Sequence, residues 1–410
     1  MPADSRMFLF YPEKLLYSEE RCNFAKRIKM KNLQKVLSCL FMLIGACCLC
    51  ACQSGTKKAD GEEQNIEMKY ATLIQLKEGE GYVSAEFRNP WDSTRVLHRY
   101  VLVPKEAELP AHLPEGDIIR TPLEKMLVYV SVHSSLFNEL GALDAIGAVG
   151  DGEYMYIDKL QADIKSGKVL DCGTSKAINV EQIIDFDPDA VIISAMEDNN
   201  SYAKLLNVGI PVVECADYME TGPLQRAEWM RFYGLLVGKQ AEADRLFTSI
   251  EENYNTLKDK VKDLKEKPTV LDGKKLNSSW YVAGIESTIG QIITDAGGRY
   301  VFPDETSNGS VPYSPEVVLD RGTDADIWML KYYKEEGDLT YQDLQDDWNG
   351  YTQLKAFREH RVHGVNLSHT NFYMVTPFHP DVLLREYINI CHPEVLEPGF
   401  QPTYFKPITE

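Results

Sequence analysis

The sequence predicts an α/β fold of two lobes, each with a central parallel β-sheet, joined by one long backbone helix and preceded by an N-terminal β extension. Three observations lead to this prediction: an internal repeat, a long helix between the two copies, and alternating strands ahead of them. The 410 residues are 44% hydrophobic and 26% charged, so the chain can bury the cores that such a fold needs.

The internal repeat consists of EQIIDFDPDAVII at 181–193 and PEVVLDRGTDADIWML at 315–330. In each copy a glutamate and an apolar helix face precede an Asp-Ala pair, and a short apolar strand follows that pair. A helix and a further strand come next, GIPVVEC at 209–215 and VHGVNL at 362–367. Each half is therefore predicted to be a strand, helix, strand, helix, strand unit with a parallel sheet. Chance similarity between two αβ units is the alternative.

The segment between the copies predicts one long helix over 241–264. Its apolar residues recur in steps of three and four, which places them on one stripe: Phe247, Ile250, Tyr254, Leu257, Val261 and Leu264. At ~1.5 Å per residue the helix is roughly 36 Å long, and Pro268 ends it before the second half. Such a helix would limit how far two lobes can close. An ordinary core helix of one larger domain is the alternative.

Ahead of the first lobe, KYATLIQL and YVSAEF alternate apolar and polar residues around a turn at 77–81, which indicates a hairpin. RVLHRYVLV at 95–103 supplies a third strand, and a proline-rich connector follows at 104–116. We expect these divisions: an upstream extension at 1–29, a lipoprotein signal peptide at 30–51, a tether at 52–65, the β extension at 66–117, the first lobe at 118–240, the interlobe helix at 241–267 and the second lobe at 268–410.

The N-terminal cysteines indicate a lipid anchor. A short basic segment begins at Met30, which we take as the true start, and the apolar run VLSCLFMLIGACCL follows it. Leu49-Cys50-Ala51-Cys52 then resembles the lipobox of bacterial lipoproteins, with Cys52 as the lipidated residue. A transmembrane helix is the alternative, but this run is shorter than the ~20 residues that span a bilayer. We expect a membrane-anchored lipoprotein that faces the periplasm of a Gram-negative-type bacterium.

Charge and motifs disfavour several functions. With 43 Lys and Arg against 62 Asp and Glu, the formal charge is −19, and nucleic acid is not an expected partner. The sequence contains no Gly-x-Ser-x-Gly elbow, P-loop, dinucleotide fingerprint or His-Glu-x-x-His motif, so we expect neither an enzyme nor a resident cofactor. His360, His363, His369 and His379 match no usual zinc spacing, and structural or surface roles are the better interpretation. Axial ligation of haem by one His or Tyr stays open.

Taken together, these residues resemble the helical-backbone periplasmic binding proteins that serve importers of ferric siderophores, haem and cobalamin. The similarity extends over 127–395 and is carried by SSLFNELGALDAIGAVGD, INVEQIIDFDPDAVIIS, LLNVGIPVV, the long helix, SSWYVAGIESTIGQIITDAGG and VPYSPEVVLDRGTDADIW. It implies a substrate-binding lipoprotein of an ABC importer, which captures an iron chelate, haem or cobalamin between its lobes and delivers it to a permease and ATPase complex. The alternatives are a bare-metal or haem-handling binding protein and, after that, a cleft enzyme such as a chelatase or hydrolase.

Aromatic residues follow the predicted strands, at the ends where α/β sheets bind ligands. Flat side chains on two facing edges would suit a flat chelate, although packing in the core is an equal alternative for each of them. Tyr156 lies in the same DGEYMY segment as one candidate. The candidates are Tyr154, Asp217 and Tyr218 in the first lobe, and Trp280, Tyr281, Tyr332, Tyr333, Phe372 and Tyr373 in the second.

The resemblance also implies one acidic residue in each lobe that meets an arginine of the permease. In the second lobe Glu316 matches directly, and a helix-capping role beside the macrodipole is its alternative. In the first lobe the matching position falls near Asn199, beside Asp198 and Glu197, and we choose Glu197.

Overall fold

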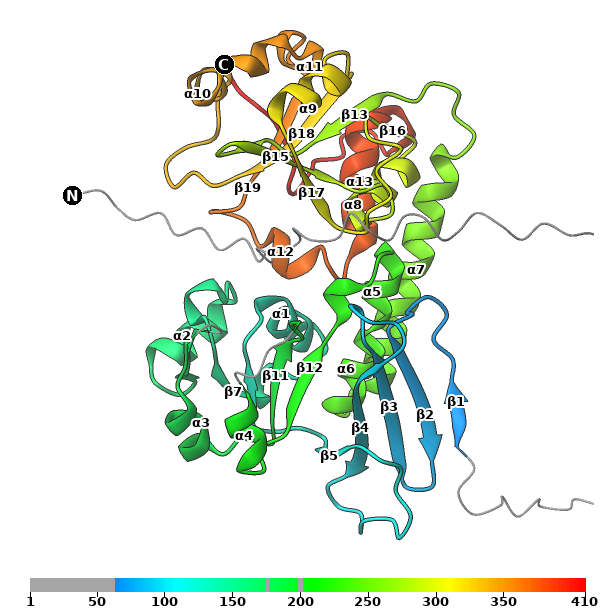
Figure 1. Ribbon diagram of the computed structural model, residues 1–410, viewed down its shortest axis with the longest axis vertical. Coiled ribbons are helices and arrows are strands. Elements are labelled where there is room, and N and C mark those ends of the chain that lie inside the picture. The colour runs from blue at the N-terminus through cyan, green and yellow to red at the C-terminus, as the bar shows by residue number, and fades with distance from the viewer. Residues whose placement is uncertain (1–62, 175–176, 198–201) are drawn as a thin grey trace, which may run out of the picture. The chain divides into compact units, whose positions relative to one another are not determined.

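The computed structural model describes residues 63–174, 177–197 and 202–410, which belong to one compact unit (Figure 1). The predicted signal peptide, the predicted lipidation site Cys52, and the residues Asp198 and Asn199 lie outside the described residues. Within the three described ranges, none of the helices combines the length and the hydropathy of a membrane span.

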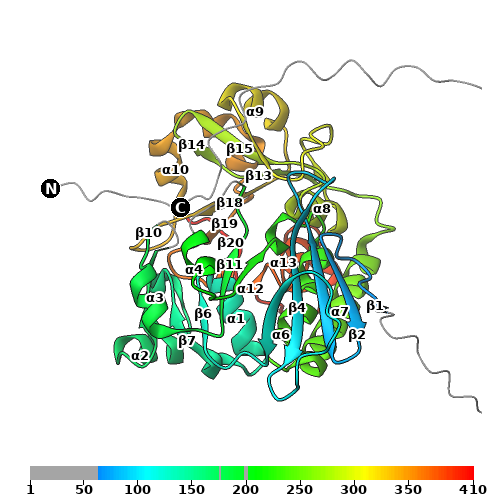
Figure 2. The ribbon, with the colours of Figure 1, turned by 60° about the horizontal axis from the view of Figure 1, so that its bottom comes forward.

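A five-stranded sheet forms the first part of the described chain, in the order β1-β2-β3-β4-β5. Strands β2 and β3 form the predicted hairpin, and Gly81 adopts φ 81° in its turn, a left-handed conformation that favours glycine. Phe87 packs edge-on against Trp229 and Phe232, with ring centroids 4.8 and 5.1 Å away. Figure 2 shows the sheet beside α6 (Met230–Leu236) and α7 (Gln240–Val261). The strands are β1 (Gln64–Ile66), β2 (Ile74–Gly79), β3 (Tyr82–Arg88), β4 (Val96–Pro104) and β5 (Asp117–Thr121).

The first lobe has a parallel sheet in the order β12-β11-β6-β7-β8. The order reverses on either side of β6, so the lobe has a topological switch point there. Its strands are β6 (Met126–Val128), β7 (Ile146–Val149), β8 (Leu170–Asp171), β11 (Ala190–Ser194) and β12 (Val212–Cys215). Its helices are α1 (Ser131–Glu139), α2 (Asp158–Lys165), α3 (Val180–Phe186) and α4 (Ala203–Asn207), and a small ribbon pairs β9 (Gly173–Thr174) with β10 (Ala177–Ile178).

The second lobe has a sheet in the order β16-β13-β18-β19-β20, parallel except for β20. The sequence did not predict its additional antiparallel sheet, in which β15 pairs with β14 and β17. The strands are β13 (Thr269–Asp272), β14 (Lys275–Leu276), β15 (Ser279–Ala283), β16 (Arg299–Tyr300), β17 (Ser310–Tyr313), β18 (Ile327–Tyr332), β19 (Val362–Asn366) and β20 (Lys406–Pro407). The helices are α8 (Thr288–Asp295), α9 (Pro315–Gly322), α10 (Tyr341–Asp347), α11 (Lys355–Arg358), α12 (Phe372–Val375) and α13 (Pro380–Cys391).

The internal repeat corresponds to α3 followed by β11 and to α9 followed by β18. An aspartate directly before each strand holds the start of the neighbouring strand. Asp189 Oδ2 accepts the backbone N–H groups of Glu124 and Lys125 at 2.7 and 3.0 Å, and Asp326 Oδ2 accepts that of Thr269 at 2.8 Å. Asp189 and Asp326 are therefore equivalent, and the Asp-Ala alignment of the sequence placed the second copy two residues too early.

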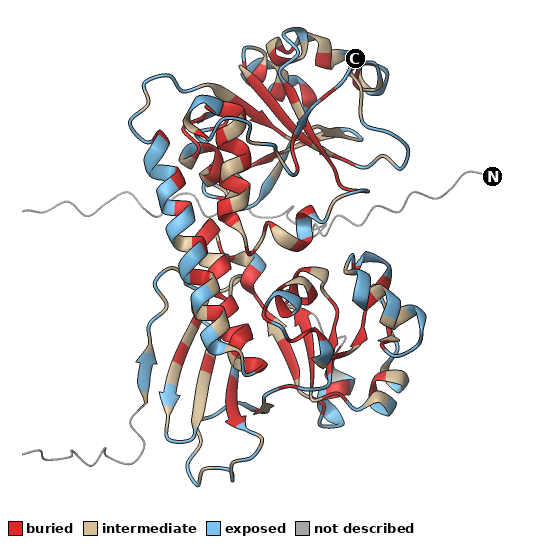
Figure 3. Cartoon of the chain, turned by 180° about the vertical axis from the view of Figure 1, so that it is seen from behind, coloured by how far each residue is buried: buried red, intermediate tan, exposed pale blue. Residues whose placement is uncertain are grey.

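The interlobe helix α7 spans Gln240–Val261, close to the predicted range. Of the predicted stripe, Leu264 is partly buried and the rest is buried: Phe247, Ile250, Tyr254, Leu257 and Val261. The helix packs against α6 (Met230–Leu236) of the first lobe and against α13 of the second, and its outer face is exposed (Figure 3). Tyr254 also donates a hydrogen bond to Asp295 of α8 at 2.7 Å. One helix thus packs against both lobes.

The segment between β1 and β2 is bound by three glutamates of the interlobe region, which we call the glutamate clamp (Glu220, Glu228 and Glu251). Glu228 is fully buried and accepts the backbone N–H groups of residues 69–71 at 2.7–2.8 Å. Glu220 accepts those of residues 72 and 73 at 2.8 Å, and Glu251 accepts the hydroxyl of Tyr70 at 2.6 Å. Since Glu228 ends α5 (Pro223–Glu228) and Glu251 lies on α7, the clamp attaches the β extension to the connection between the lobes.

Candidate functional site

Four exposed tyrosines follow strands of the two parallel sheets. Tyr154 and Tyr156 come after β7 in the first lobe, Tyr333 directly follows β18, and Tyr373 lies in α12, after β19. Their exposed fractions are 42%, 51%, 54% and 50%, in that order. Burial raises the pKa of Tyr333, and the nearby phenols of Tyr373, Tyr156 and Tyr154 raise it further. Tyr333 therefore lies near the other three tyrosines, two of which belong to the first lobe, and we call the four residues the tyrosine cluster.

Nearby carboxylates also raise the pKa values of the two first-lobe tyrosines of the cluster. Burial raises the pKa of Tyr154 and of Tyr156, and Glu153 raises both further. Glu335 of the second lobe raises the pKa of Tyr156 as well. These phenols therefore stay protonated at neutral pH and present uncharged rings with one polar tip.

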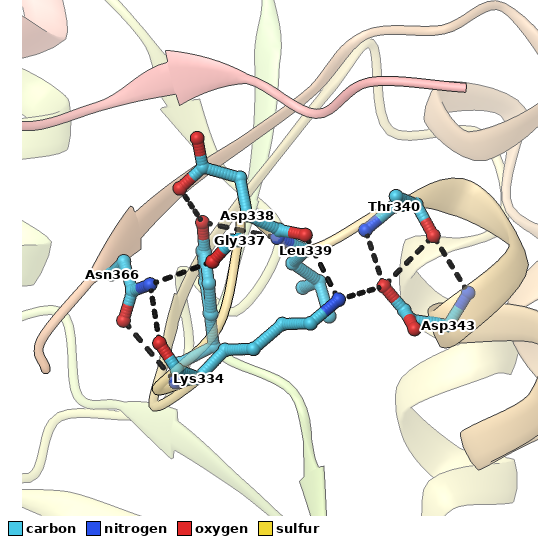
Figure 4. A network of polar contacts seen from close by, with 8 residues as sticks. Lys334, Gly337, Asp338, Leu339, Thr340, Asp343 and Asn366 are labelled. Carbon is cyan, nitrogen blue, oxygen red and sulfur yellow. Dashed lines mark hydrogen bonds and ion pairs between the residues drawn. The ribbon is translucent and has the colours of Figure 1, made fainter.

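The loop that carries Tyr333 is fixed by polar contacts (Figure 4). Lys334 Nζ donates to the Asp338 carbonyl at 3.0 Å and to Asp343 Oδ2 at 2.7 Å. Asn366, the last residue of β19, donates to the Lys334 carbonyl at 2.8 Å and accepts the Lys334 backbone N–H at 3.2 Å. A loop held in this way loses little further conformational freedom when a ligand binds.

Tyr332, one of the sequence candidates, belongs to this support and is buried. Its hydroxyl donates to Asp338 Oδ1 at 3.2 Å and accepts the Leu339 backbone N–H at 3.3 Å. Tyr332 therefore positions the loop, whereas its neighbour Tyr333 is the exposed member of the pair.

Asp217 is fully buried at the junction of the lobes. Its Oδ1 accepts the Tyr233 hydroxyl at 2.9 Å and lies 3.1 Å from His133 Nε2, and its Oδ2 accepts Arg226 Nε at 2.9 Å. Burial alone would raise the pKa of Asp217, but Arg226, His133 and Tyr233 hold it well below the usual range. Phe378, between α12 and α13, packs against this network, with its ring 6.4 Å from that of His133. Asp217 therefore holds these side chains together at the junction of the lobes, and its carboxylate is not exposed.

Trp280 and Phe372 are also buried and do not join the tyrosine cluster. Trp280 lies inside β15 with no exposed surface, and its ring is 5.5 Å from Tyr351 and 5.8 Å from Trp328. Phe372 is 2% exposed and packs against Tyr404 at 5.3 Å. Both rings fill the core of the second lobe, which favours the packing alternative for these two candidates.

The remaining aromatic candidates are partly exposed. Tyr218 is 38% exposed and donates to the Ala195 carbonyl at 2.7 Å, and burial raises its pKa to about 12. Tyr281 neighbours Trp280 in β15 and is partly exposed, because alternate residues of a strand face opposite sides. The sequence candidates omitted Tyr156, although the DGEYMY segment already contained it.

The histidines are dispersed. His379 Nε2 lies 2.7 Å from Glu139 Oε2, His360 Nδ1 lies 2.9 Å from Glu410 Oε1, and His369 Nε2 lies 2.9 Å from the Glu335 carbonyl. Burial lowers the pKa of His363 to about 4. In the described part of the chain, no group of three His, Cys, Asp or Glu side chains is arranged to hold a metal ion.

Both candidate docking acids are exposed. Glu316 lies in the first turn of α9, where Ser314 caps the helix by accepting the Val317 backbone N–H at 3.4 Å. Hydrogen bonds from its own backbone N–H and from Ser314 lower the pKa of Glu316. Glu197 follows β11 and is the last described residue before the gap at 198–201. The capping alternative for Glu316 therefore has support.

With this geometry in view, comparison with known families shows that the periplasmic binding protein family matches residues 130–365, more than half of the chain. The chain belongs to this family. The predicted membership and the two-lobed α/β fold are thus confirmed for this periplasmic binding protein. The family is one of substrate-binding, non-enzymatic proteins.

Two relatives are similar to this periplasmic binding protein over much of its length. An uncharacterized lipoprotein of Methanocaldococcus jannaschii is 27% identical over 363 residues, 82% of this chain and 84% of the relative. A cobalamin-binding protein of Halobacterium salinarum is 27% identical over 241 residues, 57% of this chain and 60% of the relative.

Solved structures share the fold. A periplasmic haem-binding protein from Pseudomonas aeruginosa superposes with a TM-score of 0.54 at 16% identity, over 70% of this chain and 98% of that one. A TroA-like periplasmic binding protein from Veillonella parvula gives 0.53 at 18% identity, over 71% of this chain and 96% of that one.

Proposed function

We propose that this periplasmic binding protein is the substrate-binding component of an ABC importer, and that it captures an iron chelate, haem or cobalamin between its lobes and delivers it to the permease. The tyrosine cluster supports this proposal most directly. It offers flat, uncharged, half-exposed rings from both lobes, and aromatic rings bury large ligand surfaces at a low entropic cost. The cobalamin-binding relative supports the same range of ligands.

The ligand itself is the most informative measurement. Native mass spectrometry and visible absorption of the full-length protein, purified from the membranes of its own cells, would reveal a bound corrinoid, haem or ferric chelate by mass and colour. We expect one such ligand to copurify or to bind on titration. Failure of all three ligand classes to bind the folded protein would contradict the proposal.

Lipid anchoring at Cys52 is part of the same proposal, and the description of the Methanocaldococcus relative as a lipoprotein supports it. We expect Cys52→Ser to move the protein from the membrane fraction to the soluble fraction. Thermal unfolding should not change, since the anchor precedes the described fold. Cys50→Ser is the matched control and should leave the protein on membranes. Membrane retention of Cys52→Ser would contradict the anchor.

We also propose that Glu197 and Glu316 contact arginines of the permease. Exposed pairs of opposite charge mainly set the rate and orientation of docking. The double variant Glu197→Lys with Glu316→Lys should therefore abolish uptake in cells, while the purified protein binds its ligand with unchanged affinity. Glu252→Lys, on the exposed face of α7, is the control and should transport normally. Full transport by the double variant would leave Glu316 with its capping role alone.

A further inference from the structure

Exposed glutamates stand next to tyrosines of the cluster in both lobes. Glu153 precedes Tyr154 in the first lobe, Glu335 follows Tyr333 in the second, and both carboxylates act on the phenol of Tyr156. Within the described part of the chain, each charged neighbour that shifts the pKa of the first-lobe tyrosines of the cluster is a carboxylate. A ligand on the cluster therefore lies close to acidic groups from both lobes.

Lys334, the basic residue directly after Tyr333, and two further basic residues of the lobes are paired with aspartates. The clearest case is Lys334, which follows Tyr333 but folds back to contact α10 (Figure 4). Two other basic groups are paired in the same way. The pairs are Lys334 with Asp343 at 2.7 Å, Arg226 with Asp217 at 2.9 Å and Lys331 with Asp272 at 3.6 Å.

This arrangement affects charged ligands unequally. An anionic ligand would lose hydration beside carboxylates that repel it. The three cations named above would not compensate for this cost, because each is already paired with an aspartate. A cationic ligand would gain from the same carboxylates, and an uncharged one would depend on contact with the rings alone.

We propose that the tyrosine cluster selects metal chelates that carry no net negative charge, so that uncharged or cationic complexes bind and anionic ones such as tricatecholate iron complexes or haem are rejected. This inference rests on the proposed function, because it assumes that a chelate lies on the tyrosine cluster, and it narrows the ligands proposed above by excluding haem.

The test uses two series of ligands that differ in charge and hardly in shape. One is ferrioxamine B, which has a free ammonium group, with its uncharged N-acetyl and anionic N-succinyl derivatives. The other is cationic aquacobalamin, neutral cyanocobalamin and an anionic cyanocobalamin monocarboxylate. In the series that binds the full-length protein, we expect affinity to fall about tenfold or more from cation to anion. The difference in affinity between the cationic and the anionic ligand should shrink as the salt concentration rises from about 0.05 M to about 0.5 M.

Variants of the two glutamates test whether they cause the charge dependence of binding. The double variant Glu153→Gln with Glu335→Gln should flatten the charge dependence while all four tyrosines remain. Glu108→Gln, an exposed change in the β extension, should preserve it. Two results would overturn the charge selection and leave the proposed function standing. One is that an anionic chelate or haemin binds most tightly. The other is that the charge dependence is unchanged in the double variant. If both series and haemin fail to bind, the proposed function falls, and this inference with it.

Discussion

Replacing Glu228 with alanine is expected to lower the free energy of unfolding by about 3–5 kcal/mol. The buried carboxylate accepts three consecutive backbone N–H groups, those of residues 69–71. Each N–H group that loses its acceptor costs about 1–3 kcal/mol. The variant no longer bears the desolvation cost of a buried carboxylate, and this offsets part of the loss. Thermal unfolding of the full-length protein, followed by circular dichroism, should show a midpoint lowered by roughly 5–10 °C.

Two further variants isolate the cause. Glu228→Gln keeps the size of the side chain but replaces one acceptor oxygen with a donor, so we expect an intermediate loss. Glu252→Ala removes an exposed glutamate from α7 and should change stability by about 0.5 kcal/mol at most. A Glu228→Ala protein that unfolds at the parent temperature would show that the clamp contributes nothing to stability.

The second large effect concerns ligand binding. The double variant Tyr156→Ala with Tyr333→Ala should lower chelate affinity roughly 100-fold, because it removes one exposed ring from each lobe. Its unfolding temperature should change little, as both side chains are about half exposed. Trp280→Ala is expected to behave in the opposite way and to cost about 3–5 kcal/mol of stability, since its ring is fully buried.

Conservative changes refine this comparison. Tyr156→Phe and Tyr333→Phe keep the rings and remove the hydroxyls, so they should retain most of the affinity if ring contact dominates. Isothermal titration at a temperature where all variants are folded gives the dissociation constants. If Trp280→Ala weakens binding without loss of stability, Trp280 belongs to the ligand site after all.

The elements that the sequence predicted well are those with local periodicity. Helix α7 was predicted to within three residues at its C-terminus, because Phe247, Ile250 and Tyr254 fall on one helical stripe and are buried. The repeat was recognised because two apolar strands each follow a similar helix, and both strands occupy interior positions in their sheets.

What the sequence did not predict depends on distant contacts. Nothing local shows that Glu228 binds residues more than 150 positions earlier in the chain. Nor does the run Trp280-Tyr281 reveal which ring faces the core, because this depends on the antiparallel partners of β15, which were not predicted. For the tyrosine cluster, the sequence placed the tyrosines after the strands, where the structure also has them, but could not separate buried Tyr332 from exposed Tyr333.

The glutamate clamp has an evolutionary consequence. It holds residues 69–73 mainly through their backbone N–H groups, which every amino acid except proline possesses. Substitutions in this segment can therefore accumulate while the attachment persists, provided that Glu220 and Glu228 remain. Distant relatives could keep the same β extension with little recognisable similarity at these five positions, and a proline there would be the one replacement that selection removes.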